Sequence, residues 1–265
     1  RSEDGLRVSE EEYWEKYYHD PDFVYELSNG RLEVKPMSDH KGSKTYQWFC
    51  GILNGYFHTC PVGKITNLEI GFRLGKTDVR RPDLGVVLND NSVRLNDDDC
   101  TYQGIFDLCV ESLSHSSKKE ITRDTVSKKG EYEGVGVREY YILDARGKET
   151  AFYALNKSGK YQRIRPTGGD IIRSGILPGF QFRISDLYTQ PSIEEMAKDP
   201  VYQDYILPSY TEAMLRVEEE AELRKQETAR AEQEAELRKQ ETARAEREAE
   251  LRKQETARAE QEAEL

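Results

Sequence analysis

Residues 137–144 have the sequence Val-Arg-Glu-Tyr-Tyr-Ile-Leu-Asp, which predicts a buried β-strand. Three earlier apolar runs are also short enough for strands: Ile65–Leu74, Leu84–Leu88 and Ile105–Leu113. Apolar residues at helical spacing predict helices over Ser43–Phe57 and Arg123–Glu133. The order helix, strand, strand, strand, helix, strand predicts a mixed central sheet with helices on its faces, which is an α/β or α+β fold.

The first part of the chain carries local signals for a capped helix and a hairpin. Ser9 with a Glu three positions later is a capping-box pattern, which predicts a short helix. Asn29-Gly30 lies between the β-prone runs Phe23–Leu27 and Arg31–Lys35. Asn-Gly favours a tight hairpin turn because both turn positions need a positive φ.

Other segments predict breaks, loops and a second hairpin. His40–Gly42 is expected to be a break in the secondary structure before the first long helix. Asn89–Gln103, rich in Asn, Asp and Ser, is expected to be a loop. Ala151–Leu155 and Tyr161–Ile164 flank a turn sequence and predict two paired strands. Beyond Pro178 the pattern is weak, which indicates irregular packing.

The C-terminal part is a repetitive, highly charged tract. From Ala221 the chain repeats every 14 residues, and residues 218–265 hold 16 Glu against 10 Lys and Arg, a net charge of −6 out of −11. The tract has no Pro or Gly and consists mostly of strong helix formers, so we expect a long charged helix. We therefore divide the chain into a first, globular domain at 1–200, a connecting segment at 201–217 and a helical tail at 218–265.

The tail does not carry a regular coiled-coil seam. Fourteen residues are two heptads, but the Leu residues occur only once per repeat, at 223, 237, 251 and 265. Two alternatives remain open, a weak coiled coil that makes a homo-oligomer and a charged single helix. Neither implies catalysis.

The acidic balance of the chain limits its partners. A net charge of −11 argues against broad coating of nucleic acid, which relies on clustered Lys and Arg. No apolar run approaches the roughly 20 residues of a membrane span, and no secretory signal is evident at the first residues. We expect a cytoplasmic protein without a membrane partner.

Two strand-borne carboxylates are the main candidates for chemistry. Asp83 precedes the run Leu84–Leu88, and Glu111 ends a run whose alternate residues should be buried. An isolated Asp at a strand start is usually structural, but a Glu at such a buried position needs a partner. If the two strands are neighbours, both carboxylates can bind one Mg²⁺, which accepts two protein oxygens plus water and phosphate.

A second group of candidates lies on the predicted helix after these strands. Asp124, Lys128 and Tyr132 are four residues apart and share one face. A solvated face with a weak Asp–Lys pair is the alternative interpretation. Next to the two carboxylates, a lysine ammonium can stabilise charge on a scissile phosphate.

Together these motifs resemble the Uma-two family, which belongs to the restriction-endonuclease-like PD-(D/E)XK superfamily. The resemblance covers roughly residues 10–190 and rests on ordered motifs: Tyr25–Gly30, His40–Gly42, Arg81-Pro82-Asp83, Asp107–Ser114, Asp124, Lys128, Tyr132, Gly136-Val137 and Glu139–Asp144.

The resemblance implies a nuclease core in which Asp83 and Glu111 hold Mg²⁺ or Mn²⁺. The superfamily usually has its lysine two residues after the Glu, where this chain has Leu113, so the resemblance implies that the lysine has moved to Lys128. Asp124 and Tyr132 would support it. His115 stands where the family often has Pro.

Glu26, in the predicted hairpin, is a further acidic candidate. It could lie beside the cation, or it could pair with an Arg in a structural role.

Three functions are compatible with these patterns. The leading hypothesis is a Mg²⁺-dependent endonuclease that hydrolyses phosphodiester bonds in DNA. The second is a noncatalytic nuclease-fold protein that acts in DNA binding or assembly through its helical tail. The third is a phosphohydrolase that acts on small nucleotides.

Overall fold

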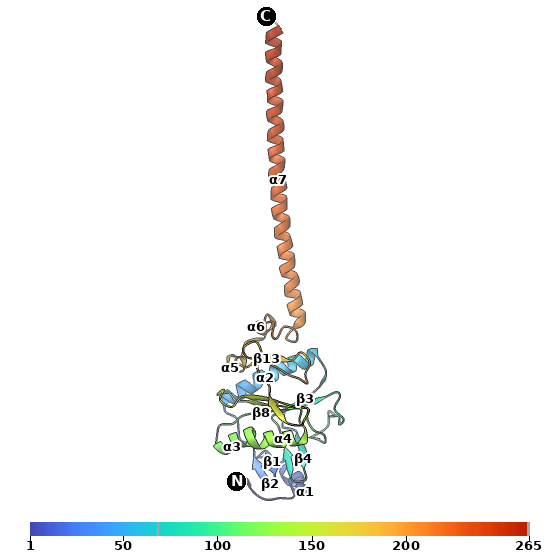
Figure 1. Ribbon diagram of the computed structural model, residues 1–265, viewed down its shortest axis with the longest axis vertical. Helices are drawn as coiled ribbons and strands as arrows, with labels where there is room; N and C mark the ends of the chain where they lie inside the picture. Colours follow the sequence, from blue (N-terminus) through green and yellow to red (C-terminus); the bar gives the residue numbers. More distant parts are fainter. Residues whose placement is uncertain (68, 264–265) are drawn as a thin grey trace. The chain divides into compact units, whose positions relative to one another are not determined.

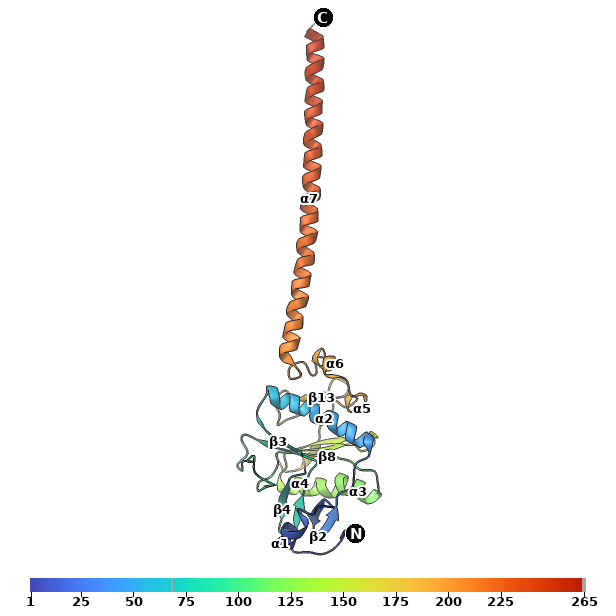
Figure 2. The same ribbon diagram turned by 180° about the vertical axis from the view of Figure 1, so that it is seen from behind.

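The structure is a computed structural model that describes residues 1–67 and 69–263 (Figures 1 and 2). The chain forms two compact units, of which the first spans Arg1–Pro208 and the second begins at Ser209. The predicted fold class is confirmed, because the first unit contains mixed sheets flanked by helices and a long helix follows it in the chain.

A six-stranded sheet forms the centre of the first unit, in the order β11-β10-β9-β8-β6-β3. Its strands are β3 (Gly63–Asn67), β6 (Leu84–Leu88), β8 (Leu108–Ser112), β9 (Glu139–Leu143), β10 (Ala151–Leu155) and β11 (Tyr161–Arg163). Strands β8 and β9 are parallel and the other neighbours are antiparallel. The order places β6 directly beside β8, so the two strands that bear the candidate carboxylates are hydrogen-bonded neighbours.

Helices cover both faces of this sheet (Figure 1). Helix α2 (His40–Thr59) buries Phe49, Ile52 and Leu53 in an apolar cluster with β6, β8 and β9. On the other face lie α3 (Lys118–Thr122), the π-helical segment η2 (Arg123–Lys128) and α4 (Lys129–Val135). Tyr132 of α4 packs there in a second apolar cluster with Val137 and Tyr140.

A second sheet has the order β2-β1-β5-β4-β7. Its strands are β1 (Tyr25–Ser28), β2 (Arg31–Val34), β4 (Gly71–Gly75), β5 (Asp78–Arg80) and β7 (Thr101–Tyr102). The predicted hairpin between β1 and β2 is confirmed, with Asn29 at φ 51° and Gly30 at φ 70°. The capped N-terminal helix is also confirmed as α1 (Glu10–Glu12) and the π-helical η1 (Tyr13–Tyr17).

Two sequence-based predictions about element boundaries are wrong. Ile65–Leu74 is not one strand, because β3 and β4 belong to different sheets; residue 68 lies outside the described residues. His40–Gly42 is not a break, since α2 begins at His40. The Asp39 side chain caps this helix by accepting a hydrogen bond from Gly42 N at 2.8 Å, and a short polar run of this kind can start a helix.

The chain after residue 165 completes the core around α2. It forms the hairpin β12 (Ile171–Arg173) and β13 (Gln181–Arg183), then the short helices α5 (Asp186–Thr189) and α6 (Ile193–Ala197). Residues 201–206, part of the segment expected to be a connector, instead bury Val201, Tyr202, Tyr205 and Ile206 in the α2 cluster. Apolar side chains at these positions make the segment part of the first unit.

Helix α7 (Pro208–Ala263) accounts for the charged repeat and is ten residues longer at its start than the repeat tract predicts. Its Leu223 and Leu237 side chains are exposed. Among the described residues, no helix combines the length and apolarity needed to cross a bilayer. Homo-oligomerisation through α7 stays a prediction.

Candidate active site

The register of β6 and β8 brings Asp83 and Glu111 to one place. Leu84 pairs with Val110 in this antiparallel ladder, so Asp83, which precedes Leu84, lies opposite Glu111. Residues directly opposite in neighbouring strands have their side chains on the same face of the sheet. The two carboxylates, 28 positions apart in the chain, are therefore neighbours across the ladder.

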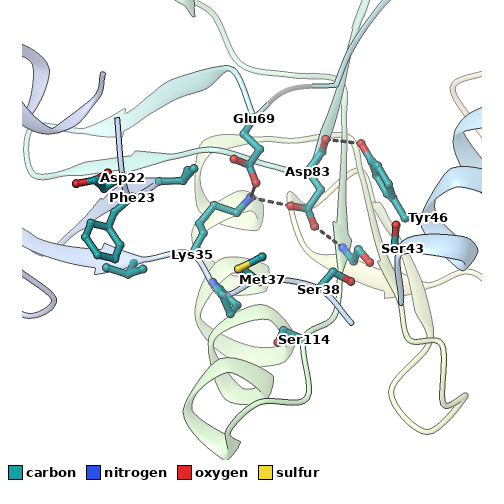
Figure 3. Close-up of a pocket in the computed structure, with 14 residues that line it drawn as sticks. Asp22, Phe23, Lys35, Met37, Ser38, Ser43, Tyr46, Glu69, Asp83 and Ser114 are labelled. Atoms are coloured by element: carbon teal, nitrogen blue, oxygen red, sulfur yellow. Dashed lines mark hydrogen bonds and ion pairs between the residues drawn. The ribbon is translucent and has the colours of Figure 1, made fainter. Parts of the chain in front are cut away.

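Asp83 is held by contacts on both of its carboxylate oxygens (Figure 3). Oδ1 lies 2.7 Å from the Lys35 ammonium, and Oδ2 accepts a hydrogen bond of 2.6 Å from the backbone N–H of Ser112. The Tyr46 hydroxyl donates to the backbone carbonyl of Asp83 at 2.7 Å. These contacts fix the carboxylate where β6 begins.

Glu111 is buried, with 2% of its side chain exposed. Its Oε1 lies 2.9 Å from the Lys128 ammonium and accepts a hydrogen bond of 2.8 Å from the Tyr132 hydroxyl. Burial raises the pKa of Glu111 to about 8, although the charges of Lys128 and Lys35 oppose this shift. Glu111 is therefore mainly protonated near neutral pH when no cation is bound.

Lys128 lies in a closed cage of carboxylates. Its ammonium is 3.1 Å from Glu26, 2.9 Å from Glu111 and 3.7 Å from Asp124, and its side chain is fully buried. Burial alone would lower the pKa of Lys128, but the three carboxylates raise it and keep the ammonium charged. The wide turn of η2, together with α4, directs Asp124, Lys128 and Tyr132 to the same side.

Glu26 makes the structural pairing with an Arg that its sequence position allowed, and it also contacts Lys128. Its carboxylate contacts the Arg80 guanidinium at 3.1 Å and the Lys128 ammonium at 3.1 Å, and it accepts a hydrogen bond of 2.8 Å from Arg81 N. Burial opposes its ionisation, but Lys128 and Arg80 outweigh burial and hold the pKa of Glu26 far below its usual range. Glu26 thus joins the arginine network of β5 to the Lys128 cage.

Sequence reasoning missed Lys35 and Glu69. The Lys35 ammonium lies 3.1 Å from Glu69 and donates to the Arg81 carbonyl at 2.6 Å, in addition to its contact with Asp83. Glu69 has φ 56°, a left-handed conformation that is uncommon for Glu and often marks functional sites. Glu33 in β2 and Lys35 just after it alternate with the apolar residues Leu32 and Val34. This alternation was the signal in the sequence that one face of the strand carries charged side chains.

A cavity of about 660 Å³ opens beside Asp83 and Lys35 (Figure 3). Four serine residues line it as well: Ser38, Ser43, Ser112 and Ser114. Among the residues that the structure describes, none forms a hydrogen bond with Ser112 Oγ. Glu111 and Lys128 are not among the lining residues, because they lie buried.

The donor set fits a hard divalent cation through two carboxylates. Within residues 1–67 and 69–263, no three His, Cys, Asp or Glu side chains are grouped so that they could hold a metal ion. Asp83 and Glu111 supply two oxygen donors on one face, and Mg²⁺ commonly takes one or two carboxylates while water and phosphate complete its shell. The Lys35 ammonium, already on Asp83, shows that this position attracts positive charge.

His115 lies outside the carboxylate group. Its Nε2 is 2.6 Å from Oδ1 of Asp144. That oxygen also accepts a hydrogen bond from the backbone N–H of Arg146, and Oδ2 accepts from those of Lys148 and Glu149. Burial would raise the pKa of Asp144, but these backbone donors and His115 lower it. The pair stabilises the turn after β9.

Residues 10–185 match the Uma2 family, described as "Putative restriction endonuclease". No curated protein matches the chain. A solved structure from Anabaena variabilis ATCC 29413, described as "a putative nuclease belonging to DUF820", is similar with a TM-score of 0.53 and 14% identity, covering 69% of this chain and 98% of the other. The family and the shared fold support a nuclease-like function.

Proposed function

This chain belongs to the Uma2 family, and we propose that it hydrolyses phosphodiester bonds in DNA with the help of a divalent cation, Mg²⁺ or Mn²⁺. The observation that carries this proposal is the ladder register that sets Asp83 opposite Glu111 beside a cavity of about 660 Å³. A cavity of this size accommodates a small-molecule-sized group, such as one nucleotide unit.

Asp83 and Glu111 would hold the cation. When bound, such an ion lowers the pKa of a water molecule and offsets the charge that develops on phosphate. Ser112 N positions the Asp83 carboxylate, and the Tyr132 hydroxyl positions that of Glu111. The Ser43 hydroxyl accepts a hydrogen bond from the Gln47 side chain and can donate one to a phosphate oxygen.

Lys128 would act on this site through Glu111. Its buried ammonium favours the ionised form of Glu111, which a cation needs, and Asp124 and Glu26 keep the ammonium in place. Removal of Lys128 should therefore weaken cation binding as well as cleavage.

One observation favours the noncatalytic alternative. The Lys35 ammonium lies on Asp83 Oδ1 at 2.7 Å and neutralises a carboxylate that a cation would need. A protein whose lysine permanently replaced the cation would bind DNA without cleaving it. Calorimetric titration with Mn²⁺ separates the two functions, since the noncatalytic protein would bind no cation.

The proposed activity is tested by incubating the full chain with plasmid DNA, single-stranded DNA, RNA and free nucleotides in Mg²⁺, in Mn²⁺ and in EDTA. We expect cation-dependent cleavage of DNA that EDTA abolishes and that Asp83→Asn and Glu111→Gln each eliminate. Lys157→Met, in an exposed turn, is the matched control. Hydrolysis of nucleotides alone would indicate the small-nucleotide phosphohydrolase, and full activity in both carboxylate variants would refute the assignment.

A further inference from the structure

Two lysines lie near the opposed carboxylates, and only one of them borders the cavity. Lys35 follows β2 and lines the cavity together with Asp83, with 6% of its side chain exposed (Figure 3). Lys128 is fully buried and contacts Glu26, Glu111 and Asp124. A phosphate that enters the cavity therefore meets the ammonium of Lys35, while that of Lys128 stays behind the carboxylates.

The ammonium of Lys35 lies on Asp83 Oδ1, the oxygen that a bound cation would also contact. It lies between Asp83 Oδ1 at 2.7 Å and Glu69 Oε1 at 3.1 Å. A divalent cation and this ammonium cannot both stay on the same Asp83 oxygen, because like charges at contact distance repel strongly.

Lys35 can leave Asp83 without losing all of its partners. Lysine carries its charge on a flexible four-carbon stem. Glu69 and the Arg81 carbonyl contact the same ammonium, so a partner remains when Asp83 is taken by a cation. The adjoining cavity gives the side chain room to turn.

We propose that Lys35 is the displaceable cation of this site: its ammonium occupies Asp83 when no divalent cation is bound, and cation binding moves it into the cavity to contact the substrate phosphate. Lys128 is then a positioning residue that acts through Glu111. The inference rests on the proposed function for the identity of the substrate, but the competition between Lys35 and a cation for Asp83 stands on geometry alone.

The test is calorimetric titration of the full chain with MnCl₂, for the unchanged protein, Lys35→Met and the exposed control Lys157→Met. Competition predicts that Lys35→Met binds Mn²⁺ at least about tenfold more tightly, because a neighbouring positive charge is gone. The same variant should lose cleavage by at least about 100-fold, because the phosphate loses its ammonium. Tighter cation binding with weaker cleavage is a combination that a merely structural lysine would not give.

Lys35→Arg keeps the charge and covers the case in which Lys35→Met does not fold. A guanidinium binds a carboxylate with two hydrogen bonds, so this variant should bind Mn²⁺ more weakly than the unchanged protein. Unchanged or weaker Mn²⁺ binding in folded Lys35→Met, or unchanged binding in Lys35→Arg, would overturn the proposal.

The outcomes separate this inference from the proposed function. Tighter Mn²⁺ binding by Lys35→Met than by the unchanged protein, with no cleavage of any substrate by the unchanged protein, would support displacement and refute the nuclease. Mn²⁺ binding by Lys35→Met alone would show that Lys35 occupies Asp83 permanently and would refute both. Cleavage by the unchanged protein together with equal Mn²⁺ affinity in Lys35→Met would support the nuclease and refute displacement. Absence of Mn²⁺ binding in both proteins would refute both.

Discussion

The ammonium of Lys128 lies 2.9 Å from Oε1 of Glu111, and neither side chain is open to solvent. A buried ion pair is a weak source of net stability, but removing one partner leaves uncompensated charge in a medium of low polarity. This relationship makes Lys128 important for the fold as well as for the proposed chemistry.

Lys128→Met should lower the free energy of unfolding by about 3–5 kcal/mol, because the buried carboxylate of Glu26 loses the ammonium. Urea denaturation at neutral pH measures this loss. Lys118→Met, on the exposed side of α3, is the matched control and should stay within about 0.5 kcal/mol of the unchanged protein. A loss below about 1 kcal/mol for Lys128→Met would contradict the enclosed cage.

Asp83→Asn should reduce cleavage by at least about 100-fold and leave the fold intact. Asparagine keeps an oxygen acceptor for Ser112 N but removes the negative charge that a cation needs. Asp83→Ala should lose cleavage as well and should also be destabilised by about 1–3 kcal/mol, because Ser112 N loses its acceptor. Circular dichroism and urea denaturation check the fold, and a cleavage rate close to normal in both variants would remove Asp83 from the site.

The protonation of Glu111 predicts how stability depends on pH. The unfolded chain loses this proton near the ordinary pKa of 4.5, whereas the folded chain keeps it up to about pH 8. Between these values the folded state binds more protons, so the contribution of Glu111 to stability falls as pH rises, by at most about 1.4 kcal/mol per pH unit. Unfolding free energies of the unchanged protein and of Glu111→Gln, measured from pH 5 to pH 8, give this slope. If the unchanged protein became more stable relative to Glu111→Gln as pH rises, the raised pKa would be contradicted.

Tyr132→Phe should shift the same titration. The hydroxyl of Tyr132 stabilises the ionised carboxylate of Glu111 by donating a hydrogen bond of 2.8 Å. Its removal should raise the pKa of Glu111 further, cost about 1 kcal/mol of stability, and move the onset of Mn²⁺ binding to higher pH. Calorimetric titrations over a pH series test this, with Tyr153→Phe on β10 as the control; identical pH profiles for Tyr132→Phe and the unchanged protein would show that the hydroxyl does not act on Glu111.

Deletion of residues 209–265 should leave the first unit as stable as before, because Arg1–Pro208 is a compact unit by itself. We expect the melting temperature to change by less than about 2 °C, and the helical signal to fall by the contribution of α7. Sedimentation of the full chain and the truncated chain separates the two interpretations of α7. A dimer that depends on residues 209–265 would indicate a coiled coil, and a monomer would indicate a single charged helix.

Most strands were predictable because their signals are local. Leu84–Leu88 forms β6 at the predicted bounds, and Asn29-Gly30 makes the predicted turn. The prediction of one strand over Ile65–Leu74 failed because the pattern of β-prone residues does not reveal that the chain passes from one sheet to another. The start of α2 was predicted wrongly. A short polar run such as His40–Gly42 is compatible with either a loop or a capped helix start, and the Asp39 side chain decides for the helix.

For the candidate site, the sequence supplied the residue types but not their environment. Asp83, Glu111 and Lys128 are recognisable by their places beside apolar runs and on a helical face. Lys35 was not, because a lysine at the end of an edge hairpin is usually solvated. Only its contact of 2.7 Å with Asp83 shows that it belongs to the site.

The sequence by itself determined many strands and the main helices of the first unit, the long charged helix, and the motifs that place the chain in its family, because each depends on the spacing of residues within one segment. The tertiary structure decided that Asp83 faces Glu111, that Lys128 is buried among carboxylates, and that the Lys35 ammonium lies on Asp83. These facts depend on the register between strands and on burial, and both arise only when segments far apart in the chain pack together.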